Sequence, residues 1–209
     1  MKIGIIGAGH VGTGLAKRLV AKNHNVMLSY SRDVAKMEAA AKELGAKTGT
    51  VAEAITFGEV IVLATPYTAT EDALKQAGKP VSGKIIWDCT NPLKPDFSGL
   101  LIGTTTSAGE QTAALAPWAR VVKGIPPFAE LLHADRMEIA GEKPGVLVCG
   151  DDPKARSVVA KLVSDIGAEP VDTGGLTLSR YIEPANMLLV ALAYGNGFGT
   201  RLGLQLKRG

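Results

Sequence analysis

A glycine-rich turn near the start of the chain has the residue types and the spacing of a phosphate-binding site. The pattern GxGxxG is formed by Gly7, Ala8, Gly9, His10, Val11 and Gly12. The first glycine permits a tight turn, the second lets a pyrophosphate approach the backbone, and the third lets a helix pack on the preceding strand. Backbone N–H groups at the positive end of that helix would hold the diphosphate. With a strand expected at 2–6 and a helix at 11–22, the turn predicts a dinucleotide site rather than a purely structural glycine turn.

The residues after the next expected strand, at 25–30, indicate which dinucleotide binds. An NAD site has an acidic residue about 20 residues beyond the glycines, where it binds the ribose 2′-hydroxyl. At that place this chain has Ser31 and Arg32, and Lys36 follows one turn into the next expected helix. A guanidinium and a hydroxyl suit a 2′-phosphate, while Asp33 fits a helix cap better than a ribose contact. The sequence therefore predicts NADP over NAD; the alternative is a solvated, basic helix start.

Two further turns follow expected parallel strands and could face the ribose or the nicotinamide. They are Thr65-Pro66-Tyr67, after a strand at 60–64, and Thr90-Asn91-Pro92, after a strand at 84–88. Ligands bind at the carboxyl edge of an open α/β sheet, and each proline stops its strand there. The predicted cofactor site therefore also includes Thr65, Pro66, Tyr67, Asn91 and Pro92. The alternative is that both are simple strand-ending turns.

The sequence contains no side-chain arrangement typical of acid–base, nucleophilic or metal catalysis. His10, His24 and His133 have no mutual spacing that suggests a metal site or a triad, and no GxSxG motif occurs. Asp88 ends an expected strand, whereas the acidic pair at 151–152 begins an expected helix, so they do not form a carboxylate pair. We therefore predict no catalytic side chain and no metal. This suits hydride transfer, in which the cofactor carries the chemistry.

Short β-branched runs alternate with helical stretches along the chain, which is the signature of βαβ units. Strands are expected at 2–6, 25–30, 60–64, 84–88, 120–123 and 146–149, and helices at 11–22, 34–44, 51–55, 69–76, 110–115, 153–166 and 178–193. These elements predict an α/β Rossmann fold with a doubly wound, mostly parallel sheet. A composition shift at 124–127 suggests an NADP-binding domain over 1–124 and a small C-terminal subdomain over 125–209.

Composition and charge argue against several other classes of protein. Of the 209 residues, 46% are hydrophobic and 21% are charged, which is ordinary for a folded domain. The net charge of +3 comes without a basic cluster, so we expect no nucleic-acid partner. Cys89 and Cys149 stand far apart, which suits a reducing cytoplasm. The longest apolar stretch, 187–194, is far below the roughly 20 residues that span a bilayer, so no membrane is expected.

The helix expected at 178–193 is apolar on nearly every side. Its apolar residues include Tyr181, Ile182, Met187, Leu188, Leu189, Val190 and Leu192. A helix of this kind is expected to be buried. Little of the chain remains to cover it, so we predict a homodimer that uses this helix. The alternative is that the helix forms the core of the C-terminal part.

The chain resembles the NADPH-dependent deazaflavin-coenzyme oxidoreductases, also called coenzyme F-420:NADP oxidoreductases, over nearly its whole length. The resemblance rests on GAGHVG at 7–12, SR at 31–32 with Lys36, and NP at 91–92. It rests above all on the distal half, which looks like the second signature of that family. The matching segments there are VCGDD at 148–152, PVDTGGL at 170–176, SR at 179–180, and NG at 196–197 with Gly199.

This resemblance implies direct hydride exchange between NADPH and a deazaflavin stacked on the nicotinamide, in a small dimeric protein. By residue match, Ala8 to Val11 would wrap the pyrophosphate, while Ser31, Arg32 and Lys36 would hold the 2′-phosphate. The phosphate turn is one residue shorter than the archaeal Gly-Gly-Thr-Gly pattern. The segment 123–128 contains no histidine, whereas the archaeal enzymes have one near the deazaflavin. NADP binding therefore carries over from the resemblance, and the identity of the acceptor does not.

Three functions remain open at the level of sequence. The first is an oxidoreductase that exchanges hydride between NADPH and a deazaflavin or flavin-type acceptor. The second is an NADP-dependent reductase of a small imine or carbonyl, although related enzymes of that kind have a longer helical second domain. The third is a non-catalytic NADP-binding sensor. For the first, we expect the acceptor over the nicotinamide, in a cleft formed by the segments 65–67, 125–127 and 195–197.

Overall fold

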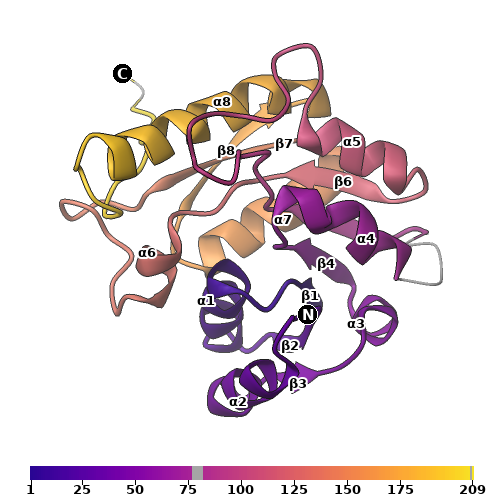
Figure 1. Ribbon diagram of the computed structural model, residues 1–209. Coiled ribbons are helices and arrows are strands. Elements are labelled where there is room, and N and C mark those ends of the chain that lie inside the picture. The colour runs from indigo at the N-terminus through magenta and orange to yellow at the C-terminus, as the bar shows by residue number, and fades with distance from the viewer. Residues whose placement is uncertain (77–81, 208) are drawn as a thin grey trace.

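The centre of the molecule is an eight-stranded sheet with the order β3-β2-β1-β4-β5-β6-β7-β8 (Figure 1). The computed structural model describes residues 1–76, 82–207 and 209. Its strands are β1 (Lys2–Ile6), β2 (Asn25–Ser29), β3 (Lys47–Thr48), β4 (Val60–Leu63), β5 (Ile85–Asp88), β6 (Arg120–Lys123), β7 (Gly145–Gly150) and β8 (Glu169–Gly174). Neighbouring strands are parallel except β6 and β7, which pair antiparallel. The predicted Rossmann-type, mostly parallel α/β sheet is confirmed.

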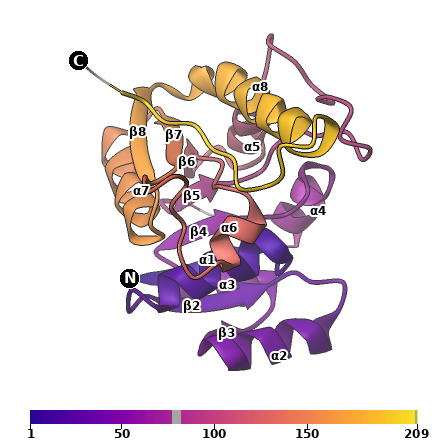
Figure 2. The ribbon, with the colours of Figure 1, turned by 90° about the vertical axis from the view of Figure 1, so that its left-hand side faces the viewer.

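Helices cover both faces of this sheet (Figures 1 and 2). One face is packed by α1 (His10–Val20), α2 (Val34–Leu44), α6 (Ala129–His133) and α7 (Pro153–Asp165). The other face is packed by α3 (Val51–Phe57), α4 (Thr70–Lys75), α5 (Ala108–Leu115) and α8 (Ser179–Val190). Short 3₁₀ turns, Tyr67–Ala69 and Leu176–Leu178, precede α4 and α8, and a π-helical turn, Ala191–Gly195, continues α8.

Two hydrophobic clusters, one on each face, hold these layers together. Successive side chains of a strand point to opposite faces, so each central strand contributes to both clusters. In β4, for example, Val62 packs into the cluster under α1, while Ile61 packs into the cluster under α3. All four residues of β4 and of β5 are buried, which explains why β4 is a continuous apolar run and why β5 is apolar up to its last residue, Asp88.

The elements that the sequence failed to predict are short or lie at the rim of the sheet. They are β3, with two residues, α6, with five, and β8. β8 is the outer strand of the sheet, and its partly exposed sequence EPVDTG lacks an apolar run. Pro170 within it is tolerated because an outer strand leaves one side of its backbone unpaired. The other predicted strands and helices begin and end within three residues of the observed ones.

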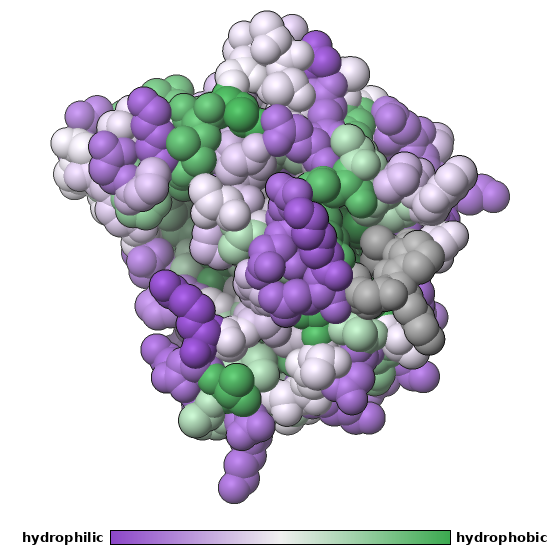
Figure 3. All heavy atoms as spheres, turned by 45° about the vertical axis from the view of Figure 1, so that its right-hand side comes forward, coloured by the Kyte–Doolittle hydropathy of each residue, from purple (hydrophilic) through white to green (hydrophobic). Residues whose placement is uncertain are grey.

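The prediction that the helix at 178–193 is buried on every side is wrong. Ile182 and Val190 of α8 pack inward, whereas Tyr181 is 67% exposed and Leu188 is 61% exposed. The reason is geometric: α8 lies on the outside of the sheet, so only one stripe of it meets the core. Figure 3 shows that hydrophobic side chains reach the surface in patches between hydrophilic ones on the face drawn there. Assembly into a homodimer stays a prediction.

The sheet continues across the segment 124–127, at which the chain was expected to divide into two parts. β7, after residues 124–127, pairs with β6, before them, through Val122 and Lys123. The last residues then return toward the sheet, where the Gly145 N–H donates to the Leu204 carbonyl at 2.6 Å (Figure 2). The division at residue 124 stays a prediction. Within the described part of the chain, no helix is both long and apolar enough to cross a membrane.

Candidate active-site cleft

The three glycines of the turn between β1 and α1 differ in their surroundings. Gly7 has φ of +110°, and a Cβ there would lie 2.6 Å from the Ala64 carbonyl oxygen. A Cβ on Gly12 would lie 1.8 Å from the Gly7 carbonyl oxygen, so Gly12 lets α1 pack against the turn. A Cβ on Gly9 would meet no described heavy atom within 4 Å, and Gly9 lines a cleft. The fold itself needs Gly7 and Gly12, whereas Gly9 leaves space for a ligand.

The first turn of α1 has the features of an anion site. His10 and Val11 line the same cleft as Gly9. Among the described residues, no side chain caps this helix, and its first turn carries no acidic residue. The first N–H groups of a helix lack acceptors within the helix, and the helix dipole adds partial positive charge there. These residues therefore fit the diphosphate of a dinucleotide.

The residues expected at the 2′-phosphate lie at the end of β2, beside this turn. Asp33 caps α2, because its carboxylate accepts the Lys36 N–H at 3.0 Å, as the sequence indicates. Ser31 Oγ donates to the Asp33 carbonyl at 2.8 Å and accepts from its N–H at 3.2 Å. The side chains of Arg32 and Lys36 are exposed at this corner of the sheet. The corner therefore presents two cations to solvent on a locally fixed backbone.

The two turns after β4 and β5 bring hydroxyl and amide groups to the same edge of the sheet. Thr65 Oγ1 lies 3.3 Å from Thr70 Oγ1, and the Tyr67 hydroxyl donates to Gln111 Oε1. Burial, together with the nearby Glu183 carboxylate, raises the pKa of the Tyr67 phenol above its ordinary value. The Oδ1 atom of Asn91 is buried and has no hydrogen-bond partner among the described residues. An unpaired buried acceptor of this kind is rare in folded proteins.

A cleft of about 650 Å³ joins part of the predicted site to the second half of the chain. Of the predicted residues, it is lined by Gly9, His10, Val11, Thr65, Pro66, Tyr67 and Asn91, together with Thr90. Other predicted residues are not among the lining residues: Gly7, Ala8, Gly12, Ser31, Arg32, Lys36 and Pro92. The segment 125–127 lines the cleft as expected, but 195–197 does not. Tyr194 lines the cleft instead, because the chain turns away after the π-helical turn.

The wall opposite the glycine turn is apolar and rich in aromatic rings. Tyr194 stacks on Phe97 with 5.7 Å between ring centroids, and it forms a T-shaped pair with Phe128 with 6.0 Å between centroids. All three rings line the cleft, although they come from segments far apart in the sequence. Leu189 and Val190 of α8 continue this wall. A flat, apolar molecule would therefore find ring faces and aliphatic side chains on this side of the cleft.

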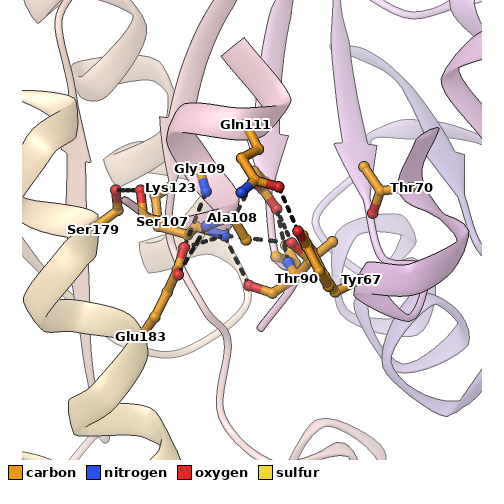
Figure 4. Close-up of polar contacts among 12 residues, drawn as sticks. Tyr67, Thr70, Thr90, Ser107, Ala108, Gly109, Gln111, Lys123, Ser179 and Glu183 are labelled. Carbon is orange, nitrogen blue, oxygen red and sulfur yellow. Dashed lines mark hydrogen bonds and ion pairs between the residues drawn. The ribbon is translucent and has the colours of Figure 1, made fainter. Parts of the chain in front are cut away.

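A fully buried ion cluster lies behind the turn that follows β5 (Figure 4). The Lys123 ammonium is 3.0 Å from Asp88 Oδ2 and 3.1 Å from Glu183 Oε1, and all three side chains are at most 2% exposed. The Lys123 ammonium also donates to the Thr90 carbonyl oxygen at 2.8 Å. Burial alone would lower the pKa of Lys123. Attraction to Asp88 and Glu183 and hydrogen bonds to both outweigh burial and raise it.

Part of this cluster could have been predicted from the sequence. Asp88 and Lys123 are the last residues of β5 and β6, and they are paired in the sheet register. Opposite charges that end two neighbouring apolar strands indicate an ion pair between them. Glu183 gave no comparable signal, because its partners lie 60 or more residues away in the chain.

The two cysteines and His133 have surroundings that indicate a role in the fold rather than in catalysis. Burial raises the pKa of the Cys149 thiol to about 12 and that of Cys89 well above its ordinary value. Both thiols therefore stay protonated near neutral pH and offer no thiolate. His133 contacts the His10 carbonyl oxygen through Nε2 at 2.9 Å, on the outside of α1. That contact joins α6 to the glycine turn.

Comparisons with known proteins agree with this geometry. A family model described as NADP oxidoreductase, coenzyme F420-dependent, matches residues 2–92. The F420-dependent NADP reductase of Methanocaldococcus jannaschii is 33% identical, with 92% of each chain covered. A solved structure from Arthrobacter sp. FB24, provisionally assigned as an F420-dependent NADP reductase, superposes with a TM-score of 0.88 at 28% identity over 100% of both chains.

A more distant likeness concerns the fold alone. The reductive aminase of Aspergillus terreus, solved with NADPH and ethyl levulinate, superposes with a TM-score of 0.71 at 18% identity. It covers 94% of this chain, but only 62% of the aminase is covered in return. The shared part is the α/β fold, and the aminase has additional chain beyond it.

Proposed function

The chain belongs to the F420-dependent NADP oxidoreductase family, and from that premise we propose that it exchanges hydride between NADPH and a deazaflavin or flavin-type acceptor. It is an NADP-binding oxidoreductase of this family. The acceptor is the proposed part. The observation that carries it is that the glycine turn and the aromatic wall line one cleft, so a cofactor and a flat second molecule can meet there.

The order of the strands supports one direction for the bound dinucleotide. The cations Arg32 and Lys36 follow β2, the glycine turn follows β1, and the turns at 65–67 and 90–92 follow β4 and β5. A dinucleotide with its 2′-phosphate beside β2 and its diphosphate on α1 would extend toward β4 and β5. Its nicotinamide end would then lie near Thr65 and Asn91. The Asn91 side chain, which lines the cleft, would then lie beside the carboxamide.

The residues of the chain act in this proposal by binding and orientation. When bound, NADPH supplies a hydride, which is a proton with two electrons, and the acceptor takes it up together with any proton it needs from solvent. The aromatic wall would hold the acceptor against the nicotinamide and exclude water from between them. Orientation of two reactants can supply about 7–11 kcal/mol of barrier reduction, so the reaction requires no protein nucleophile.

A labelling experiment tests the proposal. The protein is mixed with NADPH that carries deuterium at both C4 positions and, in separate reactions, with coenzyme F420, FMN, ferric chelate or a small cyclic imine. We expect NADPH oxidation with F420 or FMN and, in the F420 reaction, deuterium at C5 of the deazaflavin. Samples without protein correct for spontaneous oxidation, and 2′,5′-ADP should inhibit by competing for the 2′-phosphate site.

The same reactions decide between the proposal and its alternatives. Turnover of the imine alone would make the protein a reductase of small substrates. Tight NADPH binding without oxidation by any of these acceptors would indicate a sensor. Reduction of the deazaflavin without transfer of the label would contradict direct hydride transfer.

A further inference from the structure

The ion cluster of Lys123, Asp88 and Glu183 has no part in the function proposed above, yet it is the most deeply buried charged group among the described residues. The exposed fractions of the three side chains are 0%, 0% and 2%. Removing charges from water is costly, and a well-packed apolar replacement of a buried ion pair is often at least as stable. A contribution to stability therefore explains this cluster poorly, and its contacts indicate a second role.

On one side, the cluster fixes Thr90, which lines the cleft. The Thr90 carbonyl oxygen accepts from the Lys123 ammonium at 2.8 Å. The Thr90 N–H and hydroxyl both donate to Asp88 Oδ1, at 2.8 Å and 2.7 Å. The N–H, hydroxyl and carbonyl of Thr90 are thus held by two charged residues, and charged partners make the stronger hydrogen bonds. The position of the next residue, Asn91, follows from this fixed backbone.

On the other side, the cluster anchors the helices α5 and α8. The Glu183 carboxylate of α8 accepts the N–H groups of Ala108 and Gly109 at 2.9 Å and 3.0 Å (Figure 4). A Cβ on Gly109 would lie only 3.1 Å from Lys123 Cε, so the space around the ammonium is filled. The ammonium therefore lies between the Thr90 turn and α8, and both of these line the cleft.

We propose that Lys123 is a positioning residue for the nicotinamide end of NADPH. Its ammonium fixes the backbone at Thr90, and thereby Asn91, against the helix that carries the opposite wall of the cleft. This inference rests on the proposed function, because it takes NADPH to lie with its nicotinamide beside the 90–92 turn. It predicts that the cluster acts on one end of the cofactor only. The adenosine end, at β1 and β2, does not contact the cluster.

Two variants distinguish the loss of the Lys123 ammonium from the change in the buried charge of the cluster. Lys123→Met removes the ammonium and keeps a side chain of similar length, but it leaves two buried carboxylates without a cation. Such an uncompensated pair could prevent folding. Lys123→Met combined with Glu183→Gln removes one positive and one negative charge, so the formal charge of the cluster stays that of the wild type. Circular dichroism and thermal unfolding establish that each variant folds.

Binding of two ligands by calorimetry gives the decisive readout. NADPH contains the nicotinamide, whereas 2′,5′-ADP contains only the adenosine end with its 2′- and 5′-phosphates. For the double variant, we expect a Kd for NADPH about 10-fold above the wild-type value, which corresponds to one misplaced hydrogen-bonded contact. The Kd for 2′,5′-ADP should stay within about threefold, because that ligand does not reach the 90–92 turn. Lys123→Met, where it folds, should show the same pattern.

A lysine elsewhere in the sheet provides the matched control. The Lys84 ammonium also donates to a backbone carbonyl, that of Gly58, at 2.7 Å, but it lies just before β5, at the opposite edge from the cleft. Lys84→Met should lower thermal stability without changing either Kd. If neither Lys123 variant folds, Thr90→Val, which removes the hydroxyl contact to Asp88, should raise the Kd for NADPH alone.

The outcomes distinguish this inference from the proposed function. Equal losses for NADPH and 2′,5′-ADP in the folded double variant, or no loss for either, would show that the cluster only stabilises the fold. That result would overturn the positioning role and leave the proposed function intact. A wild-type protein that binds neither ligand would instead contradict the dinucleotide site itself, and the positioning role with it.

Discussion

The two walls of the cleft are built in different ways. The cofactor wall comes from the turns at the ends of β1, β4 and β5, which are neighbours in the sheet. The opposite wall is assembled from a loop at 93–97, the segment 125–128, the end of α8 and the returning tail at 202–204. Each turn of the first wall follows from a local sequence pattern, whereas the second wall depends on how distant segments pack.

Because of this difference, the two walls recognise different parts of the bound molecules. Backbone N–H groups and a glycine without a side chain recognise a phosphate in the same way whatever substrate follows. Aromatic and aliphatic side chains recognise shape, so one exchanged ring can change which acceptor fits. We infer that the cofactor wall fixes the cofactor and that the opposite wall determines the acceptor. The following predictions test that separation.

The largest effect is expected at Gly9. The side chain of Gly9→Val would enter open space in the cleft, so the fold should survive while the diphosphate is excluded. We expect NADPH and 2′,5′-ADP to bind at least about 100-fold more weakly, measured by calorimetry. Gly103→Val is the matched control, because a Cβ there also meets open space but lies away from the cleft. Unchanged NADPH affinity in Gly9→Val would mean that the turn does not bind phosphate.

A smaller and more selective effect is expected at Arg32. Its exposed guanidinium stands at the end of β2, where a 2′-phosphate would lie. A hydrogen bond to a charged group is worth about 1.5–3 kcal/mol, so Arg32→Ala should weaken NADPH binding by about 10- to 100-fold. NADH affinity should stay the same, as should both affinities in Arg136→Ala, which removes an exposed arginine elsewhere. Equal losses for NADPH and NADH would contradict a 2′-phosphate role.

The difference between the walls also explains how much the sequence predicted. The GxGxxG turn, the Asp33 cap and the strands β1, β2, β4 and β5 follow from local patterns, and the structure has them where these patterns place them. Contacts of Phe97 with Tyr194, or of Glu183 with Lys123, join residues 60 or more positions apart, and no local pattern encodes such pairs. The exposed side of α8 was missed for a related reason: composition gives the character of a helix, but not how many neighbours cover it.

The smallest effect is expected on the opposite wall, and it should appear with the acceptor alone. Tyr194 contacts both Phe97 and Phe128, so Tyr194→Ala would remove the ring that joins the other two. An aromatic contact is worth about 0.5–1.5 kcal/mol, which predicts a 2- to 10-fold higher KM for the deazaflavin in steady-state assays. NADPH affinity should not change, because the glycine turn and the basic corner are untouched. Tyr181→Ala removes a ring from the exposed side of α8 and should leave both constants at wild-type values. A higher Kd for NADPH in Tyr194→Ala, with the KM for the acceptor unchanged, would mean that this wall serves the cofactor and that the two walls are not separate in function.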